Sequence, residues 1–125
     1  MRVSRVVMWV YVGVVVVHGL IHLMGVAEGW GLADVEQLTE PVGRGAAVLW
    51  LVAAVGVLGA AVVAALRAPG WWLVTAAAAV VSQVAISTSW DDANVGTAAN
   101  VLMILAAAYG YAVQRPTQGA GEPPP

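Results

Sequence analysis

Residues 6–25 read VVMWVYVGVVVVHGLIHLMG, a run of 20 residues without a charged side chain. A helix of about 20 apolar residues is long enough to cross the hydrocarbon core of a bilayer. Arg2 and Arg5 precede the run, as basic residues precede the apolar core of a signal peptide. This run is longer than such a core, contains two His, and lacks a small-x-small cleavage site before Glu28. These features favour a retained transmembrane helix.

Three further apolar runs follow, at about 45–66, 71–89 and 96–113. The chain has 125 residues, of which 61% are hydrophobic and only 10% charged, whereas a soluble domain carries about 25% charged residues. Backbone polar groups in lipid must be satisfied within the chain, which favours helices. The sequence therefore predicts an all-α, four-helix transmembrane bundle over residues 1–113, followed by a disordered Pro/Gly-rich tail at 114–125.

Composition also excludes several classes of protein. The net charge is −2 and no basic cluster is present, which argues against nucleic acid as a partner. The absence of Cys excludes disulfides, iron–sulfur clusters and thiolate zinc sites. A bias toward Val, Ala, Gly and Arg, without Lys or Phe, is typical of a high-GC bacterial genome. We therefore expect a multi-pass protein of the bacterial cytoplasmic (inner) membrane, whose partners are the lipid bilayer and either further copies or a larger membrane complex.

The charged residues sort by side of the predicted bundle. The positive-inside rule assigns the Arg-rich side to the cytoplasm, which predicts that both termini are cytoplasmic. The cytoplasmic set would then be Arg2, Arg5, Arg67 and Arg115, and the outer set Glu28, Asp34, Glu36, Glu40, Asp91 and Asp92 with Arg44.

The few polar residues inside the predicted spans fall in their outer halves. His18 and His22 are spaced i, i+4 and share a helical face, and polar residues within a membrane often mark sites. We expect a polar pocket that opens outward, formed mainly by the first, third and fourth spans. The predicted ligand-binding residues are His18, His22, Gln83, Asp91, Asn100, Arg44 and Trp90.

Three interpretations of the His pair remain open. Two His at i, i+4 can hold a divalent metal if Glu28 or Asp91 adds a carboxylate. Alternatively, both His are packing residues that hydrogen-bond to Ser82, Gln83 or Asn100 across the bundle. In the third interpretation they belong to a small-ligand or proton-handling site, or to a membrane enzyme in which Asp91 orients them. Haem is not expected, because both His lie on one face of one helix and cannot ligate opposite sides of a haem.

The segments outside the spans carry further expectations. Residues 33–38 can form an amphipathic turn that covers the pocket, or belong to a solvated connector. Asp92, Asn94 or Thr97 can cap the last helix, and Asp91 can pair with Arg44 at the outer surface. Small residues at four-residue spacing offer a face for a second copy, and Trp residues near helix ends predict an interfacial belt. These two sets are Gly56, Ala60 and Ala64, and Trp9, Trp30, Trp50, Trp71, Trp72 and Trp90.

Three segments resemble a family of small bacterial four-helix membrane proteins. They are HGLIHLMG at 18–25, QLTEP with Gly43 and Arg44 at 37–44, and SQ through SWDDA to GTAAN at 82–100. The resemblance implies a four-helix architecture without an established activity or cofactor; some members carry a permease label. In topology alone the chain is also similar to DoxX-like four-helix proteins.

The sequence therefore predicts a small integral membrane protein whose outward-facing pocket binds a small ligand or a metal, and which can serve as an accessory subunit of a membrane complex. A purely structural or oligomeric subunit, and an enzyme or proton-handling protein that uses His18 and His22, are the alternatives.

Overall fold

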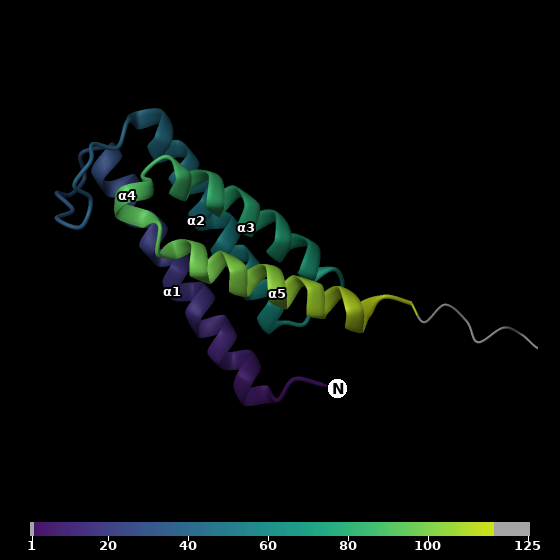
Figure 1. The fold of residues 1–125 in the computed structure, drawn as a ribbon. Helices are drawn as coiled ribbons and strands as arrows, with labels where there is room; N and C mark the ends of the chain where they lie inside the picture. The colour runs from purple at the N-terminus through teal and green to yellow at the C-terminus, as the bar shows by residue number, and fades with distance from the viewer. Residues whose placement is uncertain (1, 117–125) are drawn as a thin grey trace, which may run out of the picture.

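The computed structural model describes residues 2–116, which are helical apart from the ends and short connections and contain no strand within that range. Ser4 caps the first helix, since its side chain accepts a hydrogen bond from the amide of Val7 at 3.2 Å. The helices, labelled in Figure 1, are α1 (Arg5–Gly29), α2 (Arg44–Ala65), α3 (Trp71–Ser87), the short α4 (Trp90–Ala93) and α5 (Gly96–Gln114).

The predicted apolar runs correspond to the four long helices, with shifted ends. α1 continues beyond the predicted end at residue 25 to Gly29, whereas α3 stops at Ser87 and a turn separates it from α4. Within residues 2–116, three helices are long and apolar enough to cross a membrane, namely α1, α2 and α5. α3 is apolar but has only 17 residues. The protein therefore has the helical character of a membrane protein.

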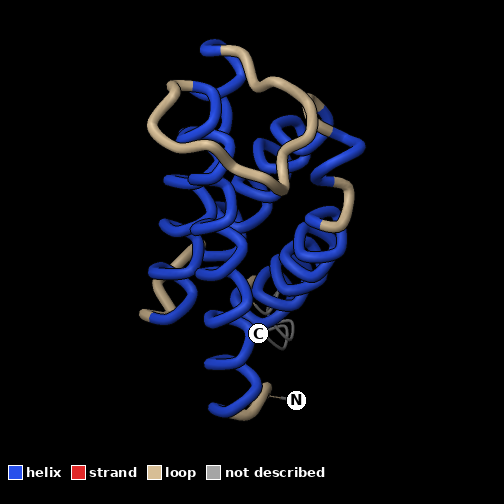
Figure 2. The backbone as a smooth tube through the Cα atoms, turned by 90° about the vertical axis from the view of Figure 1, so that its left-hand side faces the viewer, coloured by secondary structure: helices blue, strands red, loops and turns tan. Residues whose placement is uncertain are grey.

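The long helices pack in chain order, and the first and last of them pack only weakly on each other. We call the boundary between α1 and α5 the α1–α5 seam. α1 packs extensively on α2, α2 on α3, and α3 on α5, whereas α1 and α5 make little contact. In Figure 1 these two helices are close near α4 and diverge toward the other end. Both described chain ends lie at one end of the bundle, and the connection 30–43 and α4 lie at the other (Figure 2). Of the neighbouring long helices, α1 and α5 are therefore the pair that packs least.

Glycines on α1 let α2 approach closely. A Cβ built on Gly25 would lie 2.4 Å from Trp50 Cδ2, and one on Gly19 would lie 2.8 Å from side-chain atoms of Leu58. Trp50 is only 3% exposed and packs against Val26 and Ala53. Trp50 is thus a core residue of the bundle, and the expectation that it belongs to an interfacial belt is wrong.

The small-residue stripe on α2 is used within the chain. Ala60 and Ala64 are fully buried in the core, and Gly56 faces α3, because a Cβ there would lie 3.6 Å from Ala78 Cβ. Ala60 and Ala64 of the stripe therefore pack α2 into its own bundle, whereas Gly56 is half-buried.

The connection between α2 and α3 is a tight turn. Gly70 has φ +73°, a left-handed conformation that glycine adopts without steric cost. Its amide donates to Gln114 Oε1 at 3.0 Å, and Gln114 Nε2 donates to the Ala68 carbonyl at 3.3 Å. Gln114 still belongs to α5, so the predicted disordered tail does not begin there; residues 117–125 of that prediction lie outside the described residues.

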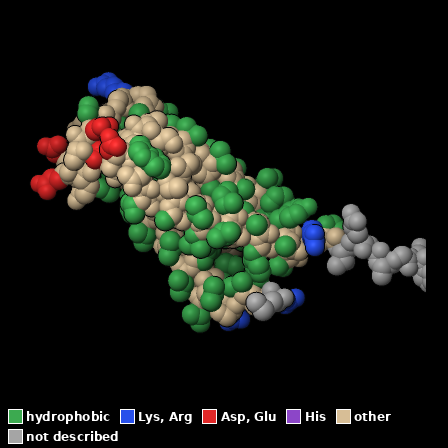
Figure 3. Space-filling model, viewed as in Figure 1, with side chains coloured by type: hydrophobic (Ala, Val, Ile, Leu, Met, Phe, Trp, Pro, Cys, Tyr) green, Lys and Arg blue, Asp and Glu red, His purple; other side chains and the backbone are tan. Residues whose placement is uncertain are grey.

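The surface has charge at its ends and apolar side chains along its flank. Figure 3 shows Asp and Glu gathered at the end formed by the connection 30–43 and α4, with Arg at both ends and no charged side chain on the visible flank between them. Along the long helices, large apolar side chains such as Val6, Val10 and Val55 are more than half exposed. An exposed apolar band of this extent suits contact with lipid.

Candidate binding cavity

A hydrogen-bonded cluster of buried polar side chains lies between α1, α3 and α5. Ser82 Oγ lies 2.9 Å from His22 Nε2 and 3.1 Å from His18 Nε2. His18 Nε2 also lies 3.0 Å from Asn100 Oδ1, and His22 Nδ1 lies 2.9 Å from the backbone carbonyl of His18. All four side chains are at most 5% exposed. The hydrogen bonds expected from the His pair to Ser82 and Asn100 are therefore present.

The cluster continues from Asn100 toward the outer face of α5. Asn100 Nδ2 donates to Gln83 Oε1 at 2.9 Å, and Gln83 Nε2 donates to Thr97 Oγ1 at 3.1 Å. Gln83 thus reaches the His pair only through Asn100. Because Asn100 uses its NH₂ on Gln83, the oxygen that faces His18 can only accept.

These acceptors fix which ring nitrogens carry hydrogen. His18 Nε2 faces the carbonyl oxygen of Asn100, so Nε2 is the donor. His22 Nδ1 faces the carbonyl oxygen of His18, so Nδ1 is the donor there. Neutral His22 then accepts at Nε2 from the Ser82 hydroxyl. The two His are therefore opposite tautomers, and this arrangement satisfies every polar atom of His22 and Ser82.

One ring nitrogen of the two His has no hydrogen-bond partner within the described residues. Among residues 2–116, no hydrogen bond reaches His18 Nδ1, which in this tautomer is an acceptor. The fully enclosed polar side-chain atoms that lack a partner in this range are Tyr11 Oη, Trp50 Nε1 and Thr75 Oγ1. His18 Nδ1 is not one of them, and His18 is a lining residue of the cavity described next.

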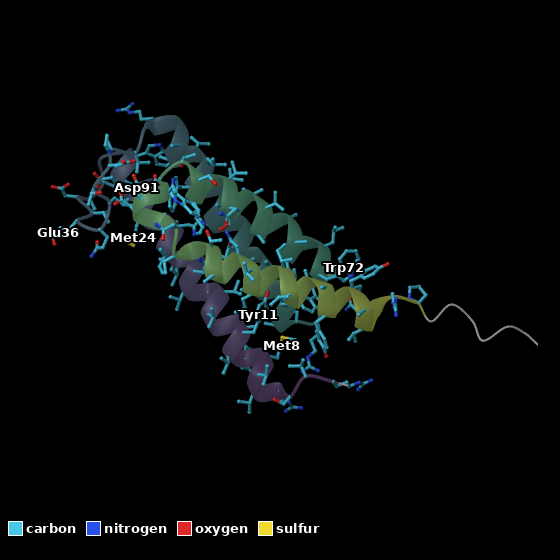
Figure 4. All side chains as sticks on the ribbon, viewed as in Figure 1. Met8, Tyr11, Met24, Glu36, Trp72 and Asp91 are labelled. Carbon is cyan, nitrogen blue, oxygen red and sulfur yellow. The ribbon has the colours of Figure 1, made fainter. Side chains whose placement is uncertain are left out.

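His18 and His22 line a cavity of about 510 Å³ at the α1–α5 seam. The other lining residues from α1 and α5 are apolar or small, including Val14, Ile21 and Ala99. Trp50 closes the cavity from α2, with its ring centroid 5.2 Å from that of His22. Figure 4 shows the labelled Met24, also a lining residue, near the α4 end, far from Met8 at the opposite end. The cavity thus lies in the half of the bundle that carries the acidic end.

The connection 30–43 covers the cavity. This corresponds to the expectation of a turn over the pocket and not to that of a solvated connector. Leu38 and Gln37 are lining residues, and a turn closed by a 2.9 Å hydrogen bond from the Leu38 amide to the Val35 carbonyl presents them. Glu28 Oε2 anchors the start of this segment by accepting from the Val35 amide at 2.8 Å. We call residues 30–43 the cover.

Asp92 holds the cover against α4. Its Oδ2 accepts from the amides of Thr39 and Glu40 at 2.8 and 3.0 Å, and its Oδ1 accepts from the Thr39 hydroxyl at 2.6 Å. These hydrogen bonds, first that of the Thr39 hydroxyl, lower the pKa of the Asp92 carboxyl below its ordinary value of 3.8. The carboxylate form is the one that accepts all three bonds, so the cover is held by the ionised side chain.

Five predicted site residues lie outside the cavity lining. Gln83 and Asn100 belong to the polar cluster that contains His18, and the other three are exposed or partly exposed at the surface. Arg44 begins α2 and is exposed, Trp90 is 49% exposed, and Asp91 is exposed at the α4 end of the molecule (Figure 4). Asn94 Nδ2 lies 3.4 Å from the backbone carbonyl of Asp91, whereas the neighbouring Asp92 makes the carboxylate contacts. Of the seven predicted ligand-binding residues, the structure brings together His18, His22, Gln83 and Asn100.

The predicted metal ligands are not gathered. In the part of the chain that the structure describes, no group of three His, Cys, Asp or Glu side chains is placed to hold one ion. Glu28 is occupied by the cover, and both His direct Nε2 at Ser82. The donor set does not fit the divalent metal that the spacing of His18 and His22 allowed.

Sequence reasoning missed Asp92 and Trp50 as parts of this site. Asp92 was expected to be a helix cap, and its contacts with residues 53 positions earlier in the chain have no local signal. Trp50 did carry a signal, because it lies about a turn inside its helix, where an interfacial Trp fits poorly. Comparisons with protein-family models, curated proteins and solved structures find no match to this chain, so the resemblance drawn from the sequence stays a prediction.

Proposed function

We propose that this protein binds a small lipophilic molecule with a hydrogen-bond-donating head group in the cavity at the α1–α5 seam. The observation that carries the proposal is the unused acceptor of His18 in a lining that is otherwise mostly apolar. Ligand pockets typically combine an apolar wall with a few polar groups that fix orientation. The cavity lies between α1 and α5, the neighbouring long helices that pack least, so a lipophilic molecule would enter it from the bilayer between them.

The chemistry of the lining favours a hydroxyl over an anion. His18 Nδ1 accepts, and the Asp92 carboxylate also belongs to the lining, so a carboxylate head would face acceptors and a negative charge. A lipophilic alcohol or phenol donates a hydrogen bond to this acceptor and carries no negative charge.

The proposal includes an arrangement in the membrane. α1, α2, α3 and α5 would each cross the bilayer of a bacterial inner membrane, with both termini in the cytoplasm. The 17 residues of α3 span about 26 Å as a helix, and the turn and α4 that follow extend this segment toward the outer surface. Arg5, Arg67 and Arg115 begin or follow helices at the terminal end, which supports this orientation. The protein would act alone, as a homo-oligomer, or as an accessory subunit of a membrane complex.

A structural role is the second candidate, and a specific observation favours it. Neutral His22 and Ser82 have all their polar atoms satisfied within the bundle, as expected of residues that only join helices. In that case the cavity binds nothing specifically, and the same experiment separates the two functions.

The test compares three probes of similar size and shape in lipid nanodiscs: a 4-alkylphenol, its methyl ether and the matching 4-alkylbenzoate. We expect the phenol to bind roughly tenfold more tightly than the ether, as one added hydrogen bond implies, and the benzoate to bind weakest. Ala99→Phe should block the cavity, because Ala99 belongs to its lining, whereas the exposed neighbour Ala98→Phe is the matched control. Equal binding of all three probes, or no effect of Ala99→Phe, would support the structural role instead.

A further inference from the structure

A second cavity lies at the opposite end of the bundle, between the start of α1 and the end of α2. Its volume is about 300 Å³, and its lining consists of Arg5, Met8, Trp9, Ala65 and Arg67. Two Arg therefore line one small cavity together with apolar side chains. Figure 4 shows the labelled Met8 at the end of the molecule away from Asp91, so this cavity is remote from the one that contains His18.

No carboxylate of the described residues is near enough in the fold to neutralise this pair. The six acidic side chains of residues 2–116 lie in the last turns of α1, in the cover and in α4, at the other end of the bundle. Two Arg that line one cavity without a carboxylate produce a positive local potential that favours an anion. The planar guanidinium group recognises phosphate through paired hydrogen bonds.

The backbone at Arg67 gives an independent indication that its side chain is needed there. Arg67 has φ +51°, and within residues 2–116 it is the single non-glycine residue with positive φ. It follows the end of α2, where its amide donates to the Ala64 carbonyl and that of Ala68 to the Val63 carbonyl, both at 3.0 Å. This is the position at which helices commonly end with glycine. An Arg in this conformation is strained, and such strain concentrates at functional sites.

We propose that Arg5 and Arg67 bind the phosphate of an anionic phospholipid, with its glycerol and upper acyl chain against Met8 and Trp9. The cavity lies at the ends of two helices that are long and apolar enough to cross a membrane, which is the depth of lipid head groups. Trp9 is 58% exposed beside the cavity, as expected for a side chain at the level of the membrane interface. A phosphate-binding Arg pair, a position at the membrane interface and an apolar wall together favour a phospholipid as the occupant.

Arg67→Gly provides a variant that removes the guanidinium and relieves the backbone. Glycine suits positive φ, so this variant should fold at least as well as the wild-type protein. Arg44→Ala is the charge-matched control, because Arg44 is an exposed Arg at the start of α2, at the opposite end of the bundle. Arg5→Ala tests the second predicted phosphate ligand.

The experiment measures retention of phosphatidylglycerol and phosphatidylcholine on the full chain by native mass spectrometry after release from mixed nanodiscs. We expect one tightly retained phosphatidylglycerol, with affinity reduced roughly tenfold or more by Arg67→Gly and by Arg5→Ala and unchanged by Arg44→Ala. Equal losses for all three variants, or equal retention of both lipids, would overturn the proposal. Displacement of the lipid by millimolar inorganic phosphate would identify a soluble phosphate compound as the occupant and would equally contradict the assignment.

Discussion

Ser82→Ala is the perturbation that tests the polar cluster most economically. The Ser82 hydroxyl lies between both imidazoles, 2.9 Å from His22 Nε2 and 3.1 Å from His18 Nε2. After its removal, His18 Nε2–H keeps Asn100 Oδ1 as an acceptor at 3.0 Å. His22 Nε2 loses the one donor that the structure gives it. The substitution therefore leaves a single buried acceptor unsatisfied.

The expected loss follows from that count. A buried acceptor without a partner costs about 1–3 kcal/mol, whereas side-chain hydrogen bonds between membrane helices average about 0.6 kcal/mol and reach about 1.7. We therefore expect Ser82→Ala to reduce the free energy of unfolding by about 1–2 kcal/mol. Ser87→Ala is the matched control on the same helix, because its exposed hydroxyl bonds only to the Gln83 carbonyl, and it should cost less than about 0.5 kcal/mol.

The assay is equilibrium unfolding in mixed micelles by titration with dodecyl sulfate, followed by circular dichroism. The double variant Ser82→Ala/His22→Phe removes both partners, so its cost should be less than the sum of the two single costs by about 1 kcal/mol or more. Equal stability of Ser82→Ala and Ser87→Ala, or additive costs in the cycle, would refute the hydrogen-bonded arrangement of the His pair.

Two further predictions concern the α1–α2 contact and the cover. Gly25→Ala places a Cβ 2.4 Å from Trp50 Cδ2 and should cost about 1–3 kcal/mol in the same titration; Gly13→Ala, with no atom within 4 Å, is the control on α1, and equal costs would contradict the packing. Because the pKa of Asp92 is lowered, its contribution to holding the cover is complete above pH 3.8, the ordinary pKa of the group. This contribution is lost as the pH falls through the lowered pKa. The Thr39 amide resonance in NMR spectra should follow that titration as the pH is lowered below 3.8. A Thr39 resonance unchanged by Asp92→Ala would show that Asp92 does not hold the cover.

The sequence predicted the four long helices because each is determined by its own local stretch of residues. Runs of about 20 apolar residues, bounded by Arg, Pro or Gly, contain the information that determines a helix in an apolar environment. The helix ends were less accurate, since Ser4 and the turns through Gly29 extend α1 beyond the apolar run. The break between α3 and α4 depends on the docking of α4 under the cover and has no apolar signature.

The candidate site also has one part that the sequence predicts and another that depends on the tertiary fold. His18, His22, Gln83 and Asn100 were predicted together because rare polar residues at one depth of a bundle must satisfy one another. The sequence could not choose between Asp91 and Asp92, since adjacent residues on a short helix point in different directions and only the fold shows which one meets Thr39. The α1–α5 seam could not be predicted from the sequence either, because it depends on which pairs of helices pack weakly in the fold.

The protonation pattern of the two imidazoles tests the central claim most directly. Nitrogen NMR of isotope-labelled histidine in the bilayer-embedded protein distinguishes a protonated ring nitrogen from an unprotonated one. We predict protonated Nε2 and unprotonated Nδ1 for His18, the reverse for His22, and a change at His18 Nδ1 alone when the alkylphenol is added. His18 protonated at Nδ1, or the same tautomer in both residues, would contradict the account.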